Sequence, residues 1–442
     1  MSSLTTPASV QKLQTTLHAK AKESPKLRFH ALYDKVYRRD VLSHAYDRCK
    51  ANGGAAGVDN QTFEDIEAYG VERWLDELTQ ELKSRTYQPL PVRRVYIPKP
   101  DGKQRPLGIP TIRDRVAQTA AVLVLEPIFE ADLQPEQYAY RADRSALDAV
   151  QHVHRLINTG HQEIVDADLS SYFDTVPHAE LMKALARRIV DGAMLHLIKM
   201  WLEAPVEETD DRGNTHRTTR NRDEGRGTPQ GSPISPLLSN LYMRRFVLGW
   251  KKSGHEQRWQ AYIVNYADDL VICCREGAEP ALATMRRMMS KMKLTVNEAK
   301  TRICKLPEEK FDFLGYTFGR CYSMMRKRVF LGTVPSKKRV QRMLHAITEE
   351  TGRDTFWMDV EILVAKLNRM LVGWANYFCL GPVSSAYSMV DYHARTRLRR
   401  WLCDKHKVQR PGYRRFPVAS LHNVFGLVNL PRRTAQLPWV KA

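Results

Sequence analysis

The chain has 442 residues, of which 43% are apolar, and its formal net charge is +20. This length supports two or three domains with a substantial core, and a charge of this sign and size calls for a polyanionic partner. Because no apolar run approaches the ~18 residues of a membrane-spanning helix and no secretory signal is visible, we expect a cytoplasmic protein that binds nucleic acid rather than a membrane.

The seven cysteines predict neither a disulfide framework nor a zinc site. Their number is odd, and no Cys-x-x-Cys pair occurs. We interpret them as reduced thiols, and Cys273 and Cys274 as core residues because they lie in an apolar run.

Helices dominate the predicted N-terminal part. The first 25 or so residues are rich in Ser, Thr and Lys, and we expect them to be frayed or loosely helical. The patterns that follow predict a helix over 27–49, a turn-rich loop over 52–59, a helix over 66–85, a strand over 94–97 and a hairpin turn over 98–103.

Strands carrying acids appear in the middle of the chain, and helices dominate its end. The patterns predict helices over 114–126, 145–157, 178–188 and 282–292, an acidic strand within 163–175, an exposed loop or ribbon over 209–227, a strand pair over 261–274, and helices over 336–350, 358–378 and 388–405. Residues 331–442 hold 19 Lys and Arg against seven Asp and Glu, so this part is the most basic.

Two adjacent acids are the sharpest feature. Asp268 and Asp269 lie between two apolar stretches, which predicts a hairpin with the acids at its tip. Burying two like charges together is costly unless a cation lies beside them. Asp is also common in surface turns, so this pattern alone leaves a metal site and a plain turn equally open.

A second acidic segment favours the metal site. Asp168 ends an apolar strand and could approach the tip at Asp268 and Asp269. Three carboxylates can bind two Mg²⁺ ions through oxygen, and such a pair of ions promotes attack by a 3′-hydroxyl and the departure of pyrophosphate. We interpret the nearby Asp166 and Asp174 as structural or supporting residues.

Two loops complete the pattern. The segment 227–233, Gly-Thr-Pro-Gln-Gly-Ser-Pro, is a shaped loop that could lie against a base pair or sugar. Lys99 and Arg105 flank a predicted hairpin turn and could bind a triphosphate, although a solvated charged turn would be the better interpretation without the carboxylates.

The C-terminal residues combine cations with aromatic rings, which suits RNA or single-stranded DNA better than a solvated face. The candidate nucleic-acid contacts are Arg395, Arg399, Arg400, Lys405, Lys407, Arg410, Arg414 and Arg415.

Taken in order, these motifs resemble the reverse transcriptases of bacterial group II introns, which are also maturases. The resemblance covers roughly residues 30–405 and includes Asn52–Asp59, Tyr140–Ala146, Leu294–Thr301, Phe313–Tyr316 and Leu371–Phe378. It implies an α+β right-hand polymerase with an N-terminal extension (1–60), fingers and palm (61–330), a helical thumb or maturase X domain (331–405) and a basic tail (406–442).

The resemblance also implies the roles of individual residues. Asp168, Asp268 and Asp269 would bind two Mg²⁺ ions, for which Mn²⁺ could substitute, with the carbonyl of Leu169 assisting. Phe173 would exclude a ribose 2′-hydroxyl, Gln230 would contact the nascent pair, Lys99 and Arg105 would hold the triphosphate, and Lys300 would donate a proton to pyrophosphate. The partners would be an RNA template, a DNA primer or target, and deoxynucleoside triphosphates, in a bacterial ribonucleoprotein associated with the nucleoid.

Some positions depart from the family pattern. Ala142-Asp143 and Ser170-Ser171-Tyr172 stand where the family usually has Pro-Gly and Lys-Gly-Phe, which leaves the subclass open. The last 37 residues hold no cysteine, so we expect no zinc-type endonuclease domain.

Three other functions stay open. Phe173 argues against an RNA-dependent RNA polymerase, which would need a polar group there, and the three acids argue against a splicing-only maturase with an inactive palm. The motifs do not distinguish an intron protein from a related reverse transcriptase in phage defence, CRISPR spacer acquisition or DNA repair.

Overall fold

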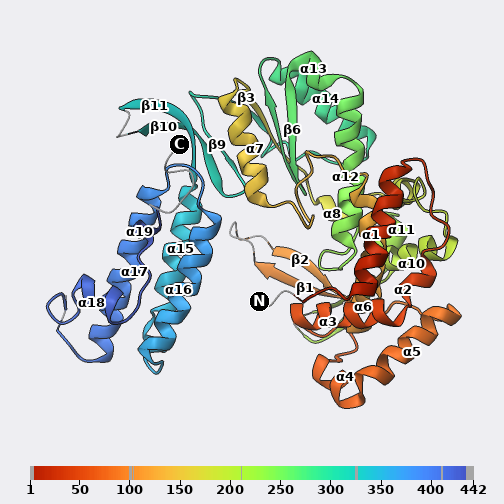
Figure 1. The fold of residues 1–442 in the computed structure, drawn as a ribbon, viewed down its shortest axis with the longest axis horizontal. Coiled ribbons are helices and arrows are strands. Elements are labelled where there is room, and N and C mark those ends of the chain that lie inside the picture. The colour runs from red at the N-terminus through yellow and green to blue at the C-terminus, as the bar shows by residue number, and fades with distance from the viewer. Residues whose placement is uncertain are drawn as a thin grey trace.

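The computed structural model describes residues 4–98, 102, 104–210, 212–323, 327–409 and 412–434. Over these residues the structure is mixed α/β, with three separate sheets. Helices flank the central sheet, and a helical unit extends from the third sheet at the C-terminal end (Figure 1). None of the described helices is long and apolar enough to cross a membrane.

The N-terminal helices pack around one long helix. They are α1 (Ala8–Glu23), α2 (Tyr33–Val36), α3 (Arg39–Asn52), α4 (Phe63–Tyr69), α5 (Val71–Ser84) and the long α6 (Ile112–Glu130). Of the two states expected for the first 25 or so residues, frayed or loosely helical, the structure has a helix, and it is packed rather than loose, because α1 buries Val10, Leu17 and Ala21 in the main core. The predicted helix over 66–85 is broken at Gly70, whose φ of +105° is suited to glycine.

The first sheet follows these helices in the order β2-β1-β4-β5. Its strands are β1 (Val92–Pro98), β2 (Gln104–Ile109), β4 (Val206–Thr209) and β5 (Thr215–Thr218), with α10 (Gly192–Glu203) before β4 and α11 (Arg220–Asp223) after β5. The predicted hairpin is present, with β1 and β2 pairing antiparallel. The exposed segment predicted over 209–227 is a ribbon that includes β5.

The central sheet has the order β6-β7-β3-β8 and is entirely antiparallel. Its strands are β3 (Glu163–Asp168), β6 (Ala261–Tyr266), β7 (Asp269–Cys274) and β8 (Arg302–Lys305). The helices around it are α7 (Ala146–Asn158), α8 (Tyr172–Thr175), α9 (His178–Leu185), α12 (Ser235–Lys252), α13 (His255–Trp259) and α14 (Ala278–Lys291).

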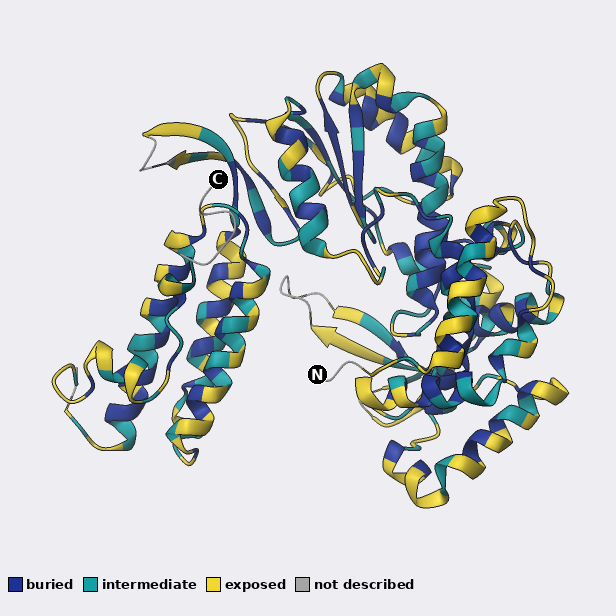
Figure 2. Cartoon of the chain, viewed as in Figure 1, coloured by how far each residue is buried: buried dark blue, intermediate teal, exposed yellow. Residues whose placement is uncertain are grey.

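Both faces of the central sheet are covered, as the buried strands in Figure 2 show. Ile164 and Cys273 belong to the cluster that includes α7, whereas Val165 and Cys274 belong to the cluster that includes α12 and α14. Because successive strand residues point to opposite faces, both neighbouring cysteines are buried, as the sequence predicted.

The third sheet leads into the C-terminal helical unit. Its strands are β9 (Phe311–Phe313), β10 (Tyr316–Ser323) and β11 (Arg328–Pro335), and the helices that follow are α15 (Lys337–Glu350), η1 (Arg353–Thr355), α16 (Val360–Tyr377), α17 (Ser384–Lys405), α18 (Val418–Asn423) and α19 (Leu430–Thr434). Phe416, Leu421 and Leu430 are buried in the same core as α15–α17. Residues 412–434 therefore pack onto this helical unit and do not form a separate tail.

Candidate active site

The hairpin that carries the two adjacent acids forms as predicted. β6 and β7 pair antiparallel up to Tyr266 and Asp269, and Ala267 (φ +57°) and Asp268 form the turn. Asn265 is buried, and its side-chain amide donates to the carbonyl of Ala267 at 2.8 Å. This bond holds the turn that presents Asp268.

Asp168 lies directly beside this turn. β3 pairs antiparallel with β7, and Asp168 is the cross-strand partner of Asp269. Side chains at directly opposed positions have Cβ atoms ~5 Å apart. The structure therefore brings together the acids that the sequence singled out, and Leu169, buried at the end of β3, follows immediately.

The electrostatics show an accumulation of negative charge. Burial raises the pKa of Asp269 to about 7, and the neighbouring acids Asp268, Asp168 and Asp166 add to the rise. The pKa of Asp268 is raised by burial and by Asp168, while Arg105 and Lys300 oppose the rise. Burial also raises the pKa of Asp166 to about 6. Carboxylates gathered in this way favour a bound proton or cation.

Two polar side chains hold Asp168. Lys300 Nζ lies 3.1 Å from Asp168 Oδ2, and the amide of Asn297 donates to the same oxygen at 2.9 Å. The backbone N–H of Asn297 also donates to the carbonyl of Asp168. Lys300 was predicted from the sequence, whereas Asn297, which lies three residues earlier in the same segment, was not.

Oxygen donors from three carboxylates suit Mg²⁺ by their chemistry. As the side chains lie, however, no three His, Cys, Asp or Glu residues among the described ones converge on a common point that could hold a metal ion. The fit to Mg²⁺ therefore depends on the donor set and its raised pKa values, with Asp168 drawn toward Lys300.

The basic hairpin reaches the same site. Arg105 lies on the exposed side of β2, close enough to Asp268 for its charge to lower the pKa of that carboxyl. Lys99, the other predicted triphosphate ligand, lies outside the described residues.

The loop over 227–233 forms hydrogen bonds with both β2 and α8. The carbonyl of Gln230 accepts a hydrogen bond from Gly108 N–H at 2.6 Å, and Thr228 N–H donates to the carbonyl of Phe173 at 2.7 Å. The side-chain amide of Gln230 lies 3.5 Å from Asp174 Oδ2. The loop is thus bonded to both β2 and α8, and the side chain of Gln230 lies near Asp174, the residue that follows Phe173.

The predicted basic contacts at the C-terminal end divide into two groups. Arg399 is buried and donates to the carbonyl of Phe416, Arg395 forms an ion pair with Asp391 at 2.7 Å, and Lys405 donates to the carbonyl of Met358. All three cations bond within the helical unit. Arg399 is buried, which contradicts its prediction as a phosphate contact, whereas Arg395 and Lys405 are partly exposed and a phosphate contact there stays a prediction. Arg400, Lys407, Arg414 and Arg415 are exposed, and Arg410 lies outside the described residues.

Two family models match the chain. Residues 97–318 match "Reverse transcriptase (RNA-dependent DNA polymerase)", which spans both loops and all three acids. Residues 340–416 match "Group II intron, maturase-specific domain", which spans most of the C-terminal helical unit.

The similar curated proteins include intron-encoded ones. "Protein YkfC" of Escherichia coli is 34% identical over 369 residues, covering 74% of this chain and 93% of YkfC. "Group II intron-encoded protein LtrA" of Lactococcus lactis is 34% identical over 229 residues, covering 50% of this chain and 36% of LtrA. "Putative COX1/OXI3 intron 1 protein" of Saccharomyces cerevisiae is 26% identical over 321 residues, covering 71% of this chain and 35% of that protein.

Proposed function

The chain belongs to the reverse transcriptases that carry a group II intron maturase domain, and we propose that Asp168, Asp268 and Asp269 form its polymerase active site with two Mg²⁺ ions. It is an RNA-directed DNA polymerase. The observation that carries the site assignment is the cross-strand pairing of Asp168 with Asp269 beside the turn at Asp268.

The chain's own residues prepare this site. Asp168, Asp268 and Asp269 would hold the ions, assisted by the carbonyl of Leu169. When bound, Mg²⁺ (or Mn²⁺ as a substitute) lowers the charge on the triphosphate and promotes ionisation of the primer 3′-hydroxyl. Asn297 keeps the Asp168 carboxylate oriented, because it bonds both the side chain and the backbone of that residue.

The surrounding groups would bind the incoming nucleotide. Arg105 neutralises triphosphate charge from β2, together with Lys99, which follows β1 in the sequence. Gln230 contacts the nascent pair, and the ring of Phe173 excludes a ribose 2′-hydroxyl. Lys300 donates a proton to the departing pyrophosphate, for which its ammonium group next to Asp168 is well placed.

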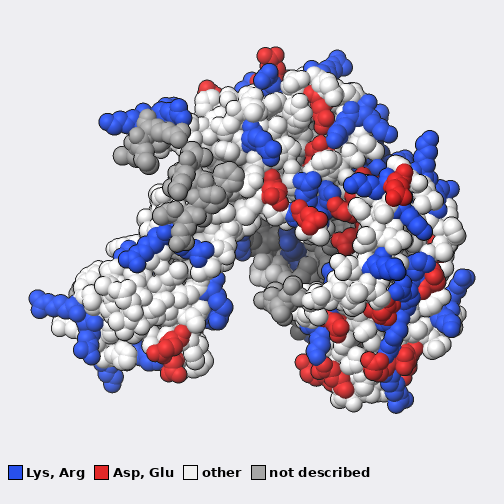
Figure 3. All heavy atoms as spheres, in the orientation of Figure 1, with Lys and Arg blue, Asp and Glu red and all other residues white. Residues whose placement is uncertain are grey.

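We propose that the chain has the architecture of a right hand. The sheet with β1 and β2 would form the fingers, the central sheet the palm, and α15–α19 the thumb or X domain. Figure 3 shows a hollow between the C-terminal helical unit and the rest of the chain, which would admit a template and primer. The exposed residues Arg400, Lys407, Arg414 and Arg415 would contact nucleic-acid phosphates.

The maturase-specific match favours a second activity, assistance of intron splicing. The RNA partner would then be the group II intron that encodes the protein, in a bacterial ribonucleoprotein. The alternatives are a related enzyme acting outside an intron, in phage defence, CRISPR spacer acquisition or DNA repair, and a maturase that only assists splicing.

Primer extension on an RNA template tests the active site. With deoxynucleotides and Mg²⁺, the wild-type protein should extend a DNA primer, and Asp268→Asn should lose at least 100-fold in rate while its affinity for RNA is unchanged. Extension by Asp268→Asn at the wild-type rate would refute the site assignment. A wild-type protein that binds and splices intron RNA but never extends a primer would be a splicing-only maturase.

A further inference from the structure

Tyr140 has a backbone conformation that tyrosine rarely adopts. Its φ is +56°, in the left-handed region, where a side chain with a Cβ atom costs ~1–2 kcal/mol. Such a conformation persists only where the surrounding contacts impose it, and it is most frequent at functional sites. The residue is also 49% exposed, so burial of its ring in a core does not explain its position.

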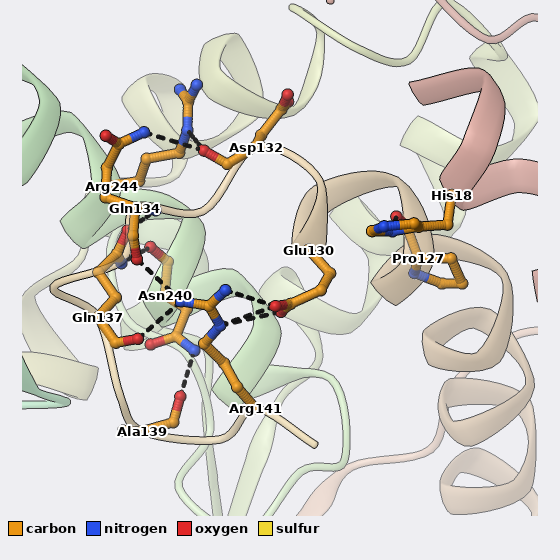
Figure 4. A network of polar contacts seen from close by, with 10 residues as sticks. All are labelled: His18, Pro127, Glu130, Asp132, Gln134, Gln137, Ala139, Arg141, Asn240 and Arg244. Carbon is orange, nitrogen blue, oxygen red and sulfur yellow. Dashed lines mark hydrogen bonds and ion pairs between the residues drawn. The ribbon is translucent and has the colours of Figure 1, made fainter. Parts of the chain in front are cut away.

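Polar contacts fix the chain on both sides of Tyr140 (Figure 4). Before it, the carbonyl of Ala139 accepts a hydrogen bond from the side-chain amide of Asn240 at 2.6 Å. After it, Arg141 forms an ion pair with Glu130 and donates to the carbonyls of Gln134 and Gln137, both at 2.8 Å. Arg141 is almost fully buried, which makes this network costly to disrupt.

The same segment is tied to the hairpin with the adjacent acids. Tyr138 N–H donates to the carbonyl of Asn265 at 3.0 Å, and Asn265 N–H donates to the carbonyl of Glu136 at 2.9 Å. Asn265 is also the residue whose side chain holds the turn before Asp268. The position of Tyr140 is therefore coupled to the active-site turn through a few hydrogen bonds.

The Tyr140 ring meets Phe173. The two ring centroids are 6.5 Å apart at an interplanar angle of 74°, an edge-to-face contact. On another side, Phe173 contacts Tyr172 at 5.7 Å, and Tyr172 is fixed by burial and by a bond from its hydroxyl to the carbonyl of Ser239. Phe173 is thus in contact with one buried and one exposed aromatic ring.

Tyr140 also lies next to the charged groups of the site. Burial raises the pKa of its hydroxyl, the charges of Asp268 and Asp269 raise it further, and Arg105 opposes the rise. The ring therefore lies near the space between the carboxylates and the basic hairpin, where the sugar of an incoming nucleotide would lie.

We propose that Tyr140 is a positioning residue for sugar selection: its ring holds Phe173 in the orientation that excludes a ribose 2′-hydroxyl. This inference depends on the role proposed above for Phe173. Because Tyr140 acts through Phe173, it should change the preference for deoxyribose over ribose and have less influence on the rate with deoxynucleotides.

The experiment compares kcat/KM for a deoxynucleotide and the matching ribonucleotide in single-nucleotide primer extension. Tyr140→Gly removes the ring and also relieves the positive φ, so this variant should fold. We expect its discrimination ratio to fall roughly three- to tenfold, the size of one lost ring contact. Tyr140→Phe keeps the ring and should retain the wild-type ratio.

Three further variants separate the possible outcomes. Phe173→Ala should lower the ratio more than Tyr140→Gly does, and the double variant should match Phe173→Ala alone. Tyr69→Ala, which removes another partly exposed tyrosine on α4, should change nothing. If Phe173→Ala leaves the ratio unchanged, the role proposed for Phe173 is wrong. If Phe173→Ala lowers the ratio but Tyr140→Gly slows both nucleotides equally, Tyr140 is only structural and this inference fails.

Discussion

Asp114 is a buried acid at the start of α6, away from the candidate active site. It is 3% exposed, and its carboxylate accepts hydrogen bonds from the Tyr87 hydroxyl at 2.5 Å and the Thr111 hydroxyl at 2.8 Å. Burial raises its pKa to about 6, although these hydrogen bonds oppose the rise. The folded chain therefore holds a proton on Asp114 at pH values where the unfolded chain has lost it.

The raised pKa of Asp114 predicts that the folded state loses stability as the pH rises. A carboxyl whose pKa is higher in the folded state contributes stability below its unfolded pKa, near 4, and this contribution is lost as the pH rises to about 6. The contribution of Asp114 to the free energy of unfolding should therefore fall by about 3 kcal/mol as the pH rises through this interval. Thermal unfolding of wild type and Asp114→Asn from pH 4 to 8 tests this. The stability of the variant relative to wild type should increase up to pH 6, and above pH 6 the difference between the two proteins should stay constant. A difference that does not change with pH would contradict it.

Gly231 has no room for a side chain. Its φ is +111°, and a Cβ atom there would lie 2.5 Å from the carbonyl oxygen of Gly108 in β2. Gly231→Ala should therefore push the 227–233 loop away from β2, which displaces Gln230. We expect about 1–3 kcal/mol of lost stability and at least tenfold slower primer extension, measured by thermal unfolding and single-turnover kinetics.

Gly254 provides the matched control for this substitution. Its φ of +71° is also positive, but a Cβ atom at this position would have no neighbour within 4 Å. Gly254→Ala should carry the cost of the backbone conformation without the steric clash, and extension should stay at the wild-type rate. Equal loss of activity in both variants would mean that strain alone, and not displacement of the loop, explains the effect.

At the scale of elements, the hairpin over 261–274 could be predicted because its strands are continuous apolar runs around two acids. The packing of helix α1 could not be predicted: because its sequence is mostly polar, it indicated only a frayed or loosely helical segment. Its helical order comes from packing: Leu17 is buried, the Gln14 amide donates to the carbonyl of Leu123, and the His18 ring bonds the carbonyl of Pro127 (Figure 4). Tertiary contacts of this kind leave little periodic signal.

In the candidate site, too, some residues could be predicted from the sequence and others depend on tertiary contacts. The acids were predictable because adjacent carboxylates in apolar strands are rare without a cation. Asn297 and Tyr140 were not selected, because their importance comes from a hydrogen bond to Asp168 and a ring contact with Phe173. Arg399 was misassigned because a basic residue on a helix gives no sign that its guanidinium will bond a buried carbonyl.

The packing of α1 gives a prediction at this scale. Leu17→Ala should destabilise the protein by about 2–5 kcal/mol, because the lost side chain leaves a cavity between α1 and the main core. Lys12→Ala, at an exposed position of the same helix, should change the unfolding midpoint little. Urea unfolding followed by circular dichroism measures both. If α1 were frayed in solution, the two substitutions would have equally small effects.

For the whole molecule, the net charge of +20 matters through its distribution. Several basic residues of the C-terminal helical unit form internal contacts. Arg399 donates to the carbonyl of Phe416, and Arg395 forms an ion pair with Asp391. Lys and Arg side chains still appear at several places on its surface (Figure 3). Exposed cations can release counterions from nucleic acid, whereas the buried guanidinium of Arg399 cannot reach a phosphate while it bonds the carbonyl of Phe416.

This distinction predicts the salt dependence of RNA binding. Arg414 and Arg415 are exposed and adjacent. Each phosphate contact contributes roughly 0.7–0.9 to the slope of log Kd against log salt. The double variant Arg414→Ala/Arg415→Ala, which removes two such contacts, should therefore lower this slope by up to about 1.4–1.8. The control Lys83→Ala/Lys291→Ala removes the same charge from exposed positions on α5 and α14, and its slope should equal that of wild type. Filter binding from 50 to 400 mM KCl measures the slopes. If the two double variants lowered the slope equally, net charge alone would govern the affinity. Phosphate contacts localised on the C-terminal helical unit require the slope to fall only when Arg414 and Arg415 are removed.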